Sequence, residues 1–337
     1  MIEMLNKWAL ESGLAKVGVA PVLDEVRKAY PWAKSVIVTA ICYLPPEHMC
    51  NDEVPQGLVA RVARGKDYHD VLREKIGRLA ARFKEERPGA RVEVCVDTCP
   101  LPERKLAVLG GIAWRGRNGN VFVEGCGSYA ALGELVTDIE LPTSKPLDID
   151  RCTDCGRCVR YCPTHAIGAN GSIDTSRCLS ALTQMSGIIP RELRKVMGNR
   201  IYGCDVCQEV CPQNAGVKPS VAEFAEEMLP GACPELIPLI DLSAEEFKNR
   251  VKSSSIGWIR RTRIRRNAAI AAGNLKCEQA IASLARVLRD ESSILRAHAA
   301  WALGEIGSEI ALTTLENALT EERDATVIEE IRAAMSK

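Results

Sequence analysis

The spacing of apolar residues divides the chain into a mixed α/β part and a helical part. Three short β-branched runs predict strands, at residues 35–44, 91–97 and 120–126. Between the first two runs, residues 68–87 carry apolar side chains at helical spacing, and Pro88 and Gly89 follow where this stripe ends. Residues 1–18 show helical spacing as well. These patterns predict two amphipathic helices beside a small sheet.

The C-terminal part of the chain contains an internal repeat. Residues 268–275 (AAIAAGNL) align with residues 299–306 (AAWALGEI) at a constant shift of 31 positions, and the same shift places Leu284 on Leu315. Short helical pairs at such a period are typical of α-solenoids of the HEAT type. An ordinary helical bundle is the alternative.

Composition and charge exclude several broad classes. The chain has 337 residues and equal numbers of basic and acidic side chains, so its overall charge does not indicate a nucleic acid or a membrane as partner. No run of eighteen apolar residues is present, and acids in the first turns of the N-terminal helix argue against a secretory signal. We expect a soluble cytoplasmic protein with no membrane partner.

Fifteen cysteines change this picture, because a chain of this length without a signal favours metal binding over a disulfide scaffold. The first block spaces its cysteines as C-x2-C-x2-C-x3-C-P, at Cys152, Cys155, Cys158 and Cys162. This spacing is typical of bacterial [4Fe–4S] ferredoxins, in which the fourth cysteine ligates the other cluster. The second block consists of Cys178, Cys204, Cys207 and Cys211. Structural zinc is the alternative.

The interlocked pattern of two-cluster ferredoxins gives a ligand assignment. One cluster would be held by Cys152, Cys155, Cys158 and Cys211. The other would be held by Cys162, Cys178, Cys204 and Cys207. Residues 140–150, with two prolines and little periodicity, mark a domain boundary before the first block. We therefore predict a multidomain α+β protein with three domains: mixed α/β at 1–145, ferredoxin-like at 146–220 and HEAT-like helical repeats at 221–337.

Two acidic or basic positions outside these blocks raise questions of chemistry. Asp97 stands between Cys95 and Cys99, and in an extended strand the three side chains would share one face. From spacing alone, a carboxylate that caps the following turn is the favoured interpretation, with the two thiols as apolar lining. His69 is the histidine of residues 67–72 (DYHDVL), which resemble the start of the D-x-H-x-x-G motif of base-on cobalamin enzymes, but Leu72 stands where that motif needs glycine. We expect His69 to be a solvated side chain.

Residues 259–267 contain five arginines with no acid among them, namely Arg260, Arg261, Arg263, Arg265 and Arg266. Guanidinium groups bind phosphate in a bidentate manner, so such a stripe in a chain of zero net charge suits an RNA backbone. We predict that these five residues bind RNA. A solvated helix face that forms salt bridges to nearby acids is the alternative.

Several segments, taken in order, resemble one known family. They are ARGKDYHDVLREKI, VDTCPLPERKLAVLGGIAWRGRN, GSYAALGELVTDIELP, IYGCDVCQEVCPQN and RIRRNAAIAAGN. Together they look like the epoxyqueuosine reductases, cobalamin-dependent iron–sulfur enzymes of tRNA queuosine synthesis. The resemblance extends from about residue 60 to the C-terminal repeats.

The resemblance implies an activity and its cofactors. Electrons would pass through two [4Fe–4S] clusters to base-off cobalamin, held between the N-terminal domain and the ferredoxin-like domain. The epoxide oxygen needs a proton as it leaves, and by family position Asp97 would be the general acid. Burial under the corrin would help this carboxyl to keep its proton. Matching segments suggest cobalamin contacts, although each could instead serve a turn or cap, at Arg61, Tyr68, Asn118, Val121, Ser128, Ser180 and Asp205.

The implied partners are the anticodon stem-loop of a tRNA and an unidentified electron donor. A chain that carries its own three modules has no obvious need of a partner subunit, so we expect a monomer. Two alternatives remain at this point. One is a corrinoid iron–sulfur reductase of a small molecule, similar to reductive dehalogenases. The other is an electron-transfer protein whose helical tail docks a protein partner.

Overall fold

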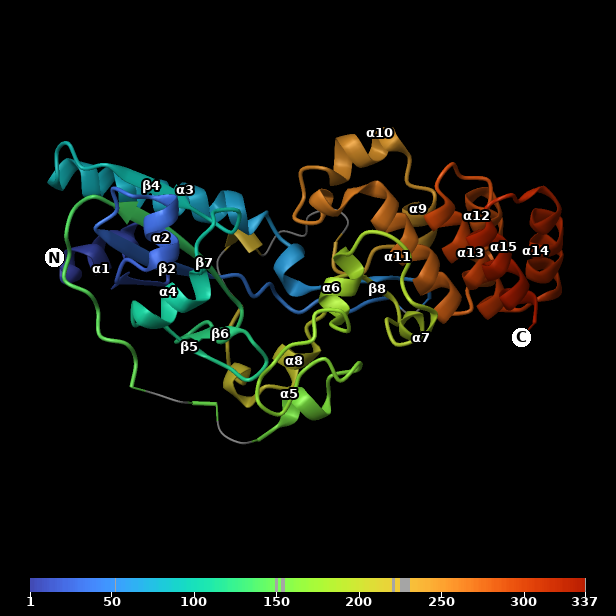
Figure 1. The fold of residues 1–337 in the computed structure, drawn as a ribbon, viewed down its shortest axis with the longest axis horizontal. Helices are drawn as coiled ribbons and strands as arrows, with labels where there is room; N and C mark the ends of the chain where they lie inside the picture. The colour runs from blue at the N-terminus through green and yellow to red at the C-terminus, as the bar shows by residue number, and fades with distance from the viewer. Residues whose placement is uncertain (52, 149–150, 153–154, 220–221, 225–230, 337) are drawn as a thin grey trace.

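The computed structural model describes residues 1–51, 53–148, 151–152, 155–219, 222–224 and 231–336. Figure 1 shows an elongated molecule, with the sheet near the N-terminus at one end and the C-terminal helices at the other. The cysteine-rich loops lie between these two ends. Within the described ranges, no helix is long and apolar enough to cross a membrane.

The N-terminal part is built on an antiparallel sheet with the strand order β1-β2-β7-β4. Its strands are β1 (Lys16–Ala20), β2 (Ser35–Cys42), β7 (Ala130–Thr137) and β4 (Val92–Cys95). The two central strands, β2 and β7, are buried along almost their whole length. Strands covered on both faces need apolar residues at nearly every position, which explains the continuous run that predicted β2.

Helices cover both faces of this sheet. One face packs against α1 (Ile2–Glu11) and α3 (Tyr68–Glu86), whose Leu5, Leu72 and Ile76 are fully buried there. The opposite face packs against α2 (Asp24–Ala29) and α4 (Glu103–Leu109), which bury Val26 and Leu106. Each of these helices therefore contributes one apolar stripe to a three-layer core.

The predicted elements of this part are confirmed, with two differences. The N-terminal helix ends at Glu11 rather than at residue 18, because the chain turns at Gly13 with a φ of +76° and enters β1. The run at 120–126 forms β6 (Val121–Val123), but β6 pairs only with β5 (Ala113–Arg115) in a separate ribbon.

The middle part consists of short elements joined by cysteine-rich loops. They are α5 (Arg157–Arg160), α6 (Leu179–Gln184), α7 (Arg191–Arg194), β8 (Arg200–Tyr202), α8 (Val206–Glu209) and the 3-10 turn η2 (Pro212–Asn214). Strand β3 (Leu58–Val59) and the 3-10 turn η1 (Arg61–Ala63) come from the N-terminal part of the sequence, yet β3 pairs with β8. Val59 and Ala63 consequently lie in the core of the second half of the molecule.

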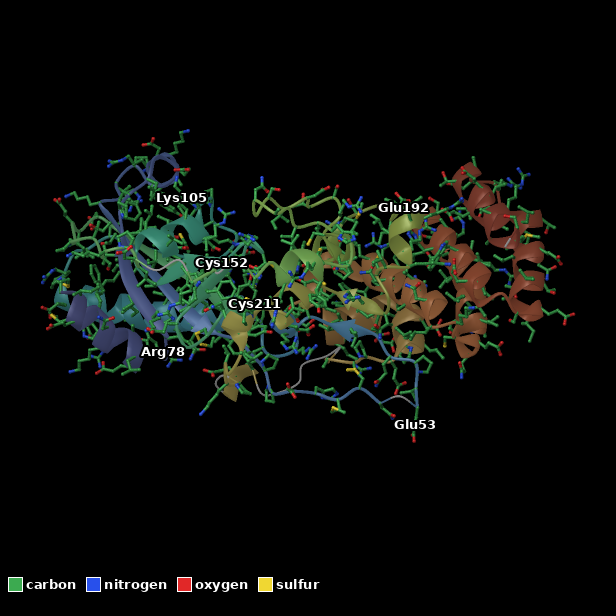
Figure 2. The ribbon with its side chains drawn as sticks, turned by 90° about the horizontal axis from the view of Figure 1, so that it is seen from below. Glu53, Arg78, Lys105, Cys152, Glu192 and Cys211 are labelled. Carbon is green, nitrogen blue, oxygen red and sulfur yellow. A yellow bond between two sulfur atoms is a disulfide. The ribbon has the colours of Figure 1, made fainter. Side chains whose placement is uncertain are left out.

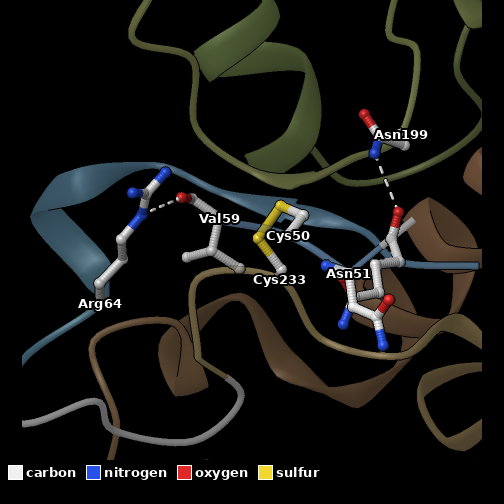
Figure 3. The surroundings of a disulfide bond; sticks show 7 residues. Cys50, Asn51, Val59, Arg64, Asn199 and Cys233 are labelled. Carbon is white, nitrogen blue, oxygen red and sulfur yellow. Dashed lines mark hydrogen bonds between the residues drawn. A yellow bond between two sulfur atoms is a disulfide. The ribbon is translucent and has the colours of Figure 1, made fainter. Parts of the chain in front are cut away.

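A disulfide holds the same crossing segment. Cys50 is bonded to Cys233, close to Val59 and Arg64, as Figure 3 shows. The N–H of Val59 donates to the carbonyl of Ala232, and the N–H of Gly57 donates to that of Pro234. This pairing of distant segments attaches the N-terminal part to the C-terminal half through backbone hydrogen bonds.

The C-terminal part begins with α9 (Leu236–Ile240), α10 (Ala244–Glu246), a π-helical turn η4 (Phe247–Val251) and a 3-10 turn η5 (Gly257–Ile259). The repeat helices follow as α11 (Arg260–Asn274), α12 (Ile281–Val287), α13 (Ser293–Ile306), α14 (Glu309–Glu321) and α15 (Ala325–Met335). Helix α13 packs between α11 and α15.

The repeat predicted from the sequence is visible in this packing. Leu284 and Leu315, which the shift aligns, are both fully buried. Gly273 and Gly304 are also aligned, and a Cβ on either would approach the next inner helix too closely, at Ala302 and Ala334 respectively. Small residues at equivalent positions let consecutive inner helices meet, as expected for stacked repeats.

Candidate active site and cluster-binding loops

Asp97 lies just after the end of β4, in a left-handed backbone conformation with a φ of +54°. Its backbone N–H donates to Oε1 of Glu103 at 2.6 Å, which holds this uncommon conformation in place. Cys95 packs among the residues that face α4, whereas the carboxylate of Asp97 lies at the start of α3. The expectation that residues 95, 97 and 99 share one face is therefore wrong, because the left-handed turn breaks the alternation of the strand.

His69 lies between two carboxylates. Its Nδ1 is 2.6 Å from Oδ1 of Asp67, and its Nε2 is 3.1 Å from Oδ2 of Asp97. Asp67 also caps α3 by accepting the backbone N–H of His69. The imidazole side chain is only 18% exposed, so the expectation of a solvated histidine is wrong. The spacing D-x-H before a helix was the available signal, since an N-cap carboxylate is placed to reach a side chain two residues later.

These partners stabilise the charged imidazole. The hydrogen bond to Asp67 raises the pKa of His69, burial opposes that rise, and the hydrogen bond to Asp97 adds to it. Only the imidazolium can donate from both ring nitrogens at once. The arrangement therefore presents a proton on Nε2, directed at the carboxylate of Asp97.

Two further carboxyl groups lie near this loop, and the sequence reading missed both. Burial raises the pKa of Glu103, the N–H of Asp97 lowers it, and the charge of Asp97 raises it again. Glu134, in β7, is 1% exposed, and burial together with Glu103 and Cys99 raises its pKa well above the ordinary value. Its Oε2 has no hydrogen-bond partner among the residues that the structure describes. Burial therefore favours a neutral, proton-bearing carboxyl at Glu134.

Of the two thiols beside Asp97, Cys95 is buried and Cys99 is partly buried. Cys95 is fully buried, and its Sγ lies 3.2 Å from the hydroxyl of Tyr30. Burial raises the pKa of the Cys95 thiol, and Cys99 contributes to that rise. Neither cysteine is among the residues that line the cavity in front of Asp97. The predicted lining role of these thiols is replaced by packing against the α4 side of the sheet.

A cavity of about 190 Å³ lies in front of Asp97 and is open on one side. Three of the predicted cobalamin contacts line it together with Asp97, namely Tyr68, Val121 and Ser128. Ala130, Ala131 and Leu132 contribute apolar side chains to its lining.

The remaining predicted contacts lie around this cavity or away from it. Arg61 forms ion pairs with Asp205 and Glu209, and its backbone N–H donates to Asp205 Oδ2 at 2.7 Å. Asn118 donates from Nδ2 to the carbonyl of Cys207 at 3.2 Å. Ser180 lies in α6 and bonds only locally in the described part, to Gln184 and Thr183.

A polar network joins the cavity to the cysteine-rich loops. Ser128 Oγ donates to Gln208 Oε1 at 2.8 Å, and Gln208 Nε2 in turn donates to Asp205 Oδ1 at 2.8 Å. Gln208 follows Cys207 directly in α8. The wall of the cavity is thus in direct contact with the loop that carries the second cysteine block.

Four of the eight predicted cluster ligands line one common pocket, and they are Cys152, Cys155, Cys158 and Cys211. Figure 2 shows Cys152 and Cys211 in the middle of the molecule, although 59 positions separate them in the sequence. The backbone N–H of Arg117 donates to the sulfur of Cys152 at 3.3 Å. This is the set expected for the first cluster, and backbone amides aimed at cysteine sulfurs suit an iron–sulfur group.

Three cysteines of the second set lie close to one another. Burial raises the pKa of the Cys207 thiol, and the nearby Cys204 and Cys178 raise it further, so these three lie together. Cys162 accepts the backbone N–H of Ala166 at 3.3 Å. Among the described residues, no three His, Cys, Asp or Glu side chains converge closely enough for a single metal ion.

Four of the other seven cysteines form disulfides. Besides Cys50–Cys233, Cys42 at the end of β2 is bonded to Cys126 after β6, which joins the sheet to the small ribbon. The sequence favoured metal binding over disulfides, and that preference does not hold for these four cysteines. Cys277 is buried in the repeat domain.

The five arginines do not form one exposed stripe. Arg266 is fully buried and donates to the carbonyls of Leu182, Met185 and Gly187, near the end of α6. Arg265 is buried as well and pairs with Asp290 at 2.6 Å. The predicted RNA contact is therefore wrong for these two. A helix exposes only part of its circumference, and five positions in seven cannot all face solvent.

The other three arginines are accessible to different degrees. Arg260 is exposed, and Arg261 and Arg263 are partly buried. Arg261 donates to the carbonyl of Leu242 at 3.0 Å. Among the described residues, Arg260 and Arg263 form no ion pair with an acid. A local positive surface therefore remains at the start of α11.

Three segments of the chain match known families. Residues 24–98 match the family described as epoxyqueuosine reductase QueG, DUF1730, and residues 151–214 match the 4Fe-4S double cluster binding domain. Residues 260–336 match HEAT repeats. The last two matches confirm the iron–sulfur and repeat predictions at the level of the domain.

Relatives that match most of the chain are epoxyqueuosine reductases. The chain is 36% identical to the epoxyqueuosine reductase of Bacillus cereus over 318 residues, which are 90% of this chain and 81% of that one. It is 37% identical to that of Escherichia coli over 250 residues, which are 74% of this chain and 66% of that one.

Solved structures of the same family superpose closely. A crystal structure of an epoxyqueuosine reductase with an epoxyqueuosine-modified tRNA-Tyr stem loop gives a TM-score of 0.93 at 32% identity, covering 99% of this chain and 97% of that one. The Bacillus subtilis enzyme gives 0.92 at 31% identity, covering 99% and 98%, and that structure has its catalytic aspartate loop swung out of the active site.

Proposed function

The chain belongs to the epoxyqueuosine reductase family, and on that premise we propose that it is an oxidoreductase that converts epoxyqueuosine to queuosine in tRNA. The observation that carries this proposal is the position of Asp97. Its carboxylate lies at an open cavity, 3.1 Å from Nε2 of a histidine whose charged form it stabilises, in a chain with a segment that matches a double [4Fe–4S] domain.

The proposed cofactor ligands follow from the same geometry. Two [4Fe–4S] clusters would be held by the two sets of four cysteines predicted from the sequence, and they would supply single electrons. Cobalamin would be held at the cavity by Tyr68, Val121 and Ser128, with Arg61, Asn118 and Asp205 behind them. When bound there, it would supply a reducible cobalt next to the substrate. We leave Ser180 out of this set, because its described contacts are local.

Removal of the epoxide oxygen as water requires two electrons and two protons. The Asp97 carboxyl lies at the cavity and can deliver a proton to the oxygen as the ring opens. The imidazolium of His69 lies 3.1 Å away and can then return a proton to Asp97. Asp67 holds the imidazole in the orientation that this transfer needs. The pair of Asp97 and His69 shares one transferable proton, and the second proton of a turnover would reach it from solvent through the open side of the cavity.

The loop that carries Asp97 needs to be held inward for this transfer. A related structure has its catalytic aspartate loop swung out, and we propose that the loop of this chain has two positions as well. Glu103 accepts the backbone N–H of Asp97 and lies among the residues of the cavity. Its role would be to position Asp97 against His69.

The proposed partner is the anticodon stem-loop of a tRNA, bound without a membrane and by a monomer. The accessible Arg260, Arg261 and Arg263 would contact its phosphates. The three proposed domains remain those predicted, at 1–145, 146–220 and 221–337. Electrons would come from a separate donor protein, whose identity the fold does not specify.

The proposal is tested by anaerobic incubation of the cluster-loaded protein with cobalamin, a chemical reductant and tRNA that contains epoxyqueuosine. Mass spectrometry of the digested nucleosides should show queuosine formed by the wild-type protein. Asp97→Asn keeps the shape of the side chain, and should lower turnover by about 100- to 10,000-fold while cluster absorbance is unchanged.

Two results would contradict the proposal at different points. If the wild-type protein holds clusters but neither binds cobalamin nor forms queuosine, electron transfer to a protein partner becomes the better explanation. If the wild type is active and Asp97→Asn turns over equally fast, the general-acid role belongs to another group.

A further inference from the structure

Trp258 is an exposed indole directly before α11. It is 56% exposed, whereas Ile256 and Ile259 on either side of it are fully buried. Of the five tryptophans, Trp114 and Trp301 are almost completely buried, and the other two are partly buried. A large aromatic side chain left in solvent is unusual in a folded chain and indicates a contact surface.

The backbone around Trp258 is built to hold this position. Trp258 lies in η5, where a Cβ on Gly257 would come within 2.2 Å of the carbonyl oxygen of Lys252, so the tight turn requires glycine. Arg260, two residues later, adopts a φ of +67°, which a side chain other than glycine rarely takes. Strain of this kind persists where the surrounding structure enforces it, and often marks functional sites.

A hydrogen bond also fixes the orientation of the indole. Its Nε1 donates to the hydroxyl of Tyr202 at 3.2 Å, and Tyr202 is itself 8% exposed. The ring is therefore fixed in direction while one of its surfaces stays open, so that little conformational entropy is lost when another flat group stacks on it.

Tyr202 connects this indole to the wall of the cavity. Its carbonyl accepts the N–H of Ala60 at 2.8 Å, and the next residue, Arg61, donates its N–H to Asp205 in the polar network that ends at Ser128 in the cavity lining. Tyr202 is also the last residue of β8, one residue before Gly203 and two before Cys204. A group stacked on Trp258 would consequently lie beside the cavity of Asp97.

The charge beside Trp258 indicates the chemistry of its ligand. Arg260 is exposed, Arg263 is partly buried, and within the described ranges neither pairs with an acid. An aromatic ring next to free guanidinium groups is the arrangement by which proteins bind unpaired nucleotides, with the base on the ring and the phosphates on the arginines. Docking of a protein partner would not need an aromatic ring here, because an aliphatic surface would serve as well, whereas stacking of a base requires the ring.

We propose that Trp258 is a stacking platform for an unpaired base of the RNA loop, next to the nucleotide whose modified base enters the cavity of Asp97. Arg260 and Arg263 hold the adjoining phosphates. This inference rests on the proposed function, since it names how that RNA is seated. The platform positions the loop and takes no part in proton transfer.

The test uses the full-length, cluster-loaded protein and a synthetic anticodon hairpin RNA with a fluorescent label. Trp258→Ala should weaken hairpin binding by about 5- to 100-fold, as expected for one lost base–aromatic stack. Trp258→Phe keeps a ring and should stay within about threefold of the wild type. Leu275→Ala, which removes another exposed apolar side chain at the far end of α11, serves as the matched control and should change nothing.

Kinetics should separate the platform from the chemistry. With epoxyqueuosine-containing tRNA, Trp258→Ala should raise KM while kcat stays close to that of the wild type. The double variant Arg260→Gln, Arg263→Gln should weaken hairpin binding in low salt. It should also reduce the slope of the logarithm of the binding constant against the logarithm of salt concentration, by the amount expected when about one to two phosphate contacts are lost. Circular dichroism and cluster absorbance verify that each variant is folded.

Several outcomes would overturn the inference or support it. Unchanged hairpin affinity in folded Trp258→Ala overturns it, and leaves a protein partner as the occupant of this surface. Equal losses in Trp258→Ala and Trp258→Phe also overturn it, because stacking would then not be the cause. If the wild type forms no queuosine but Trp258→Ala still weakens hairpin binding, the platform stands and the proposed reaction fails.

Discussion

Two histidines, one at the cavity and one in the repeat domain, have pKa values that are shifted in opposite directions. His69, at the cavity, lies between the carboxylates of Asp67 and Asp97, which raise its pKa. His298, in α13, is fully buried, and burial together with Arg194 and Arg266 lowers its pKa to about 3. The surroundings of the first histidine stabilise its charged form, and those of the second stabilise its neutral form.

The surroundings of these two residues explain the difference. His298 accepts the N–H of Ile189 on Nε2, and its Nδ1 lies 2.7 Å from the carbonyl of Ile294, so both ring nitrogens have a partner. Around His69, by contrast, Asp97 stays 54% exposed and open to the cavity. The comparison teaches that a histidine with both ring nitrogens satisfied inside the repeat domain is closed to chemistry, while the carboxylate beside His69 keeps a free side at the cavity.

The largest expected effect concerns the interface itself. Arg194 is fully buried and forms a bidentate ion pair with Glu330 at 2.9 and 3.0 Å, which joins α7 to α15. Arg194→Met should lower the free energy of unfolding by about 3–5 kcal/mol, because it leaves Glu330 buried with only the half-exposed Arg191. Urea denaturation measures this change.

A second variant makes that prediction specific. Arg194→Met combined with Glu330→Leu removes both charges, and should recover much of the lost stability. If the double variant is as unstable as the sum of the two single variants, the ion pair is not what Arg194 contributes. The packing of its guanidinium near Trp301 would then be the better explanation.

The next effect is the pH dependence of stability at His298. Because its folded pKa lies below its ordinary value near 6.5, the unfolded chain binds the proton first as the pH falls. Stability should therefore decrease between about pH 6.5 and pH 3, with a slope of up to one proton, or about 1.4 kcal/mol per pH unit.

His298→Leu should remove that part of the slope, whereas His165→Leu, at an exposed position, should retain it. Urea midpoints measured at several pH values provide the comparison. Equal slopes in wild type and His298→Leu would mean that the buried histidine does not drive loss of stability in acid.

The same contrast explains what the sequence could predict. Helix α3, the strands β2 and β4 and the stacked repeats follow from local periodicity, because each buries one regular face. The spacing of cysteines at 152, 155 and 158 also carries its own chemistry. Such features depend on residues close together in the chain.

The errors arose where distant segments meet. The burial of Arg266 depends on the carbonyls at the end of α6, and Nε2 of His69 meets Asp97, 28 positions away, in addition to the nearby Asp67 on Nδ1. The raised pKa values of Glu103 and Glu134 result from burial, which depends on how α4 and β7 pack. None of these contacts has a periodic signature, so spacing alone predicted a solvated histidine and an exposed stripe of arginines.

A smaller effect is expected when His69 is replaced. His69→Gln should lower turnover by about 10- to 100-fold, since Asp97 would lose its proton source but keep its place at the cavity. The raised pKa of His69 means that its charge, and the stability it adds through both carboxylates, is present at low pH and is lost as the pH rises through the folded value.

The pH profile of kcat in the wild type should accordingly fall on the alkaline side, above the ordinary histidine range, and His69→Gln should lack that limb. His48→Gln provides the control, because His48 is a histidine outside the cavity. An unaltered alkaline limb in His69→Gln would assign the titration to a different group.

The smallest expected effect concerns Glu103, and it distinguishes a residue that positions Asp97 from one that takes part in proton transfer. Glu103→Ala removes the acceptor for the N–H of Asp97 and should lower kcat by about tenfold, since the left-handed loop loses its support at 2.6 Å. Glu103→Gln keeps an acceptor oxygen and should stay within about threefold. If both variants lose activity equally, the charge or the proton of Glu103 matters more than its hydrogen bond. The Glu103 carboxyl would then act in proton transfer at the cavity rather than in positioning the loop of Asp97.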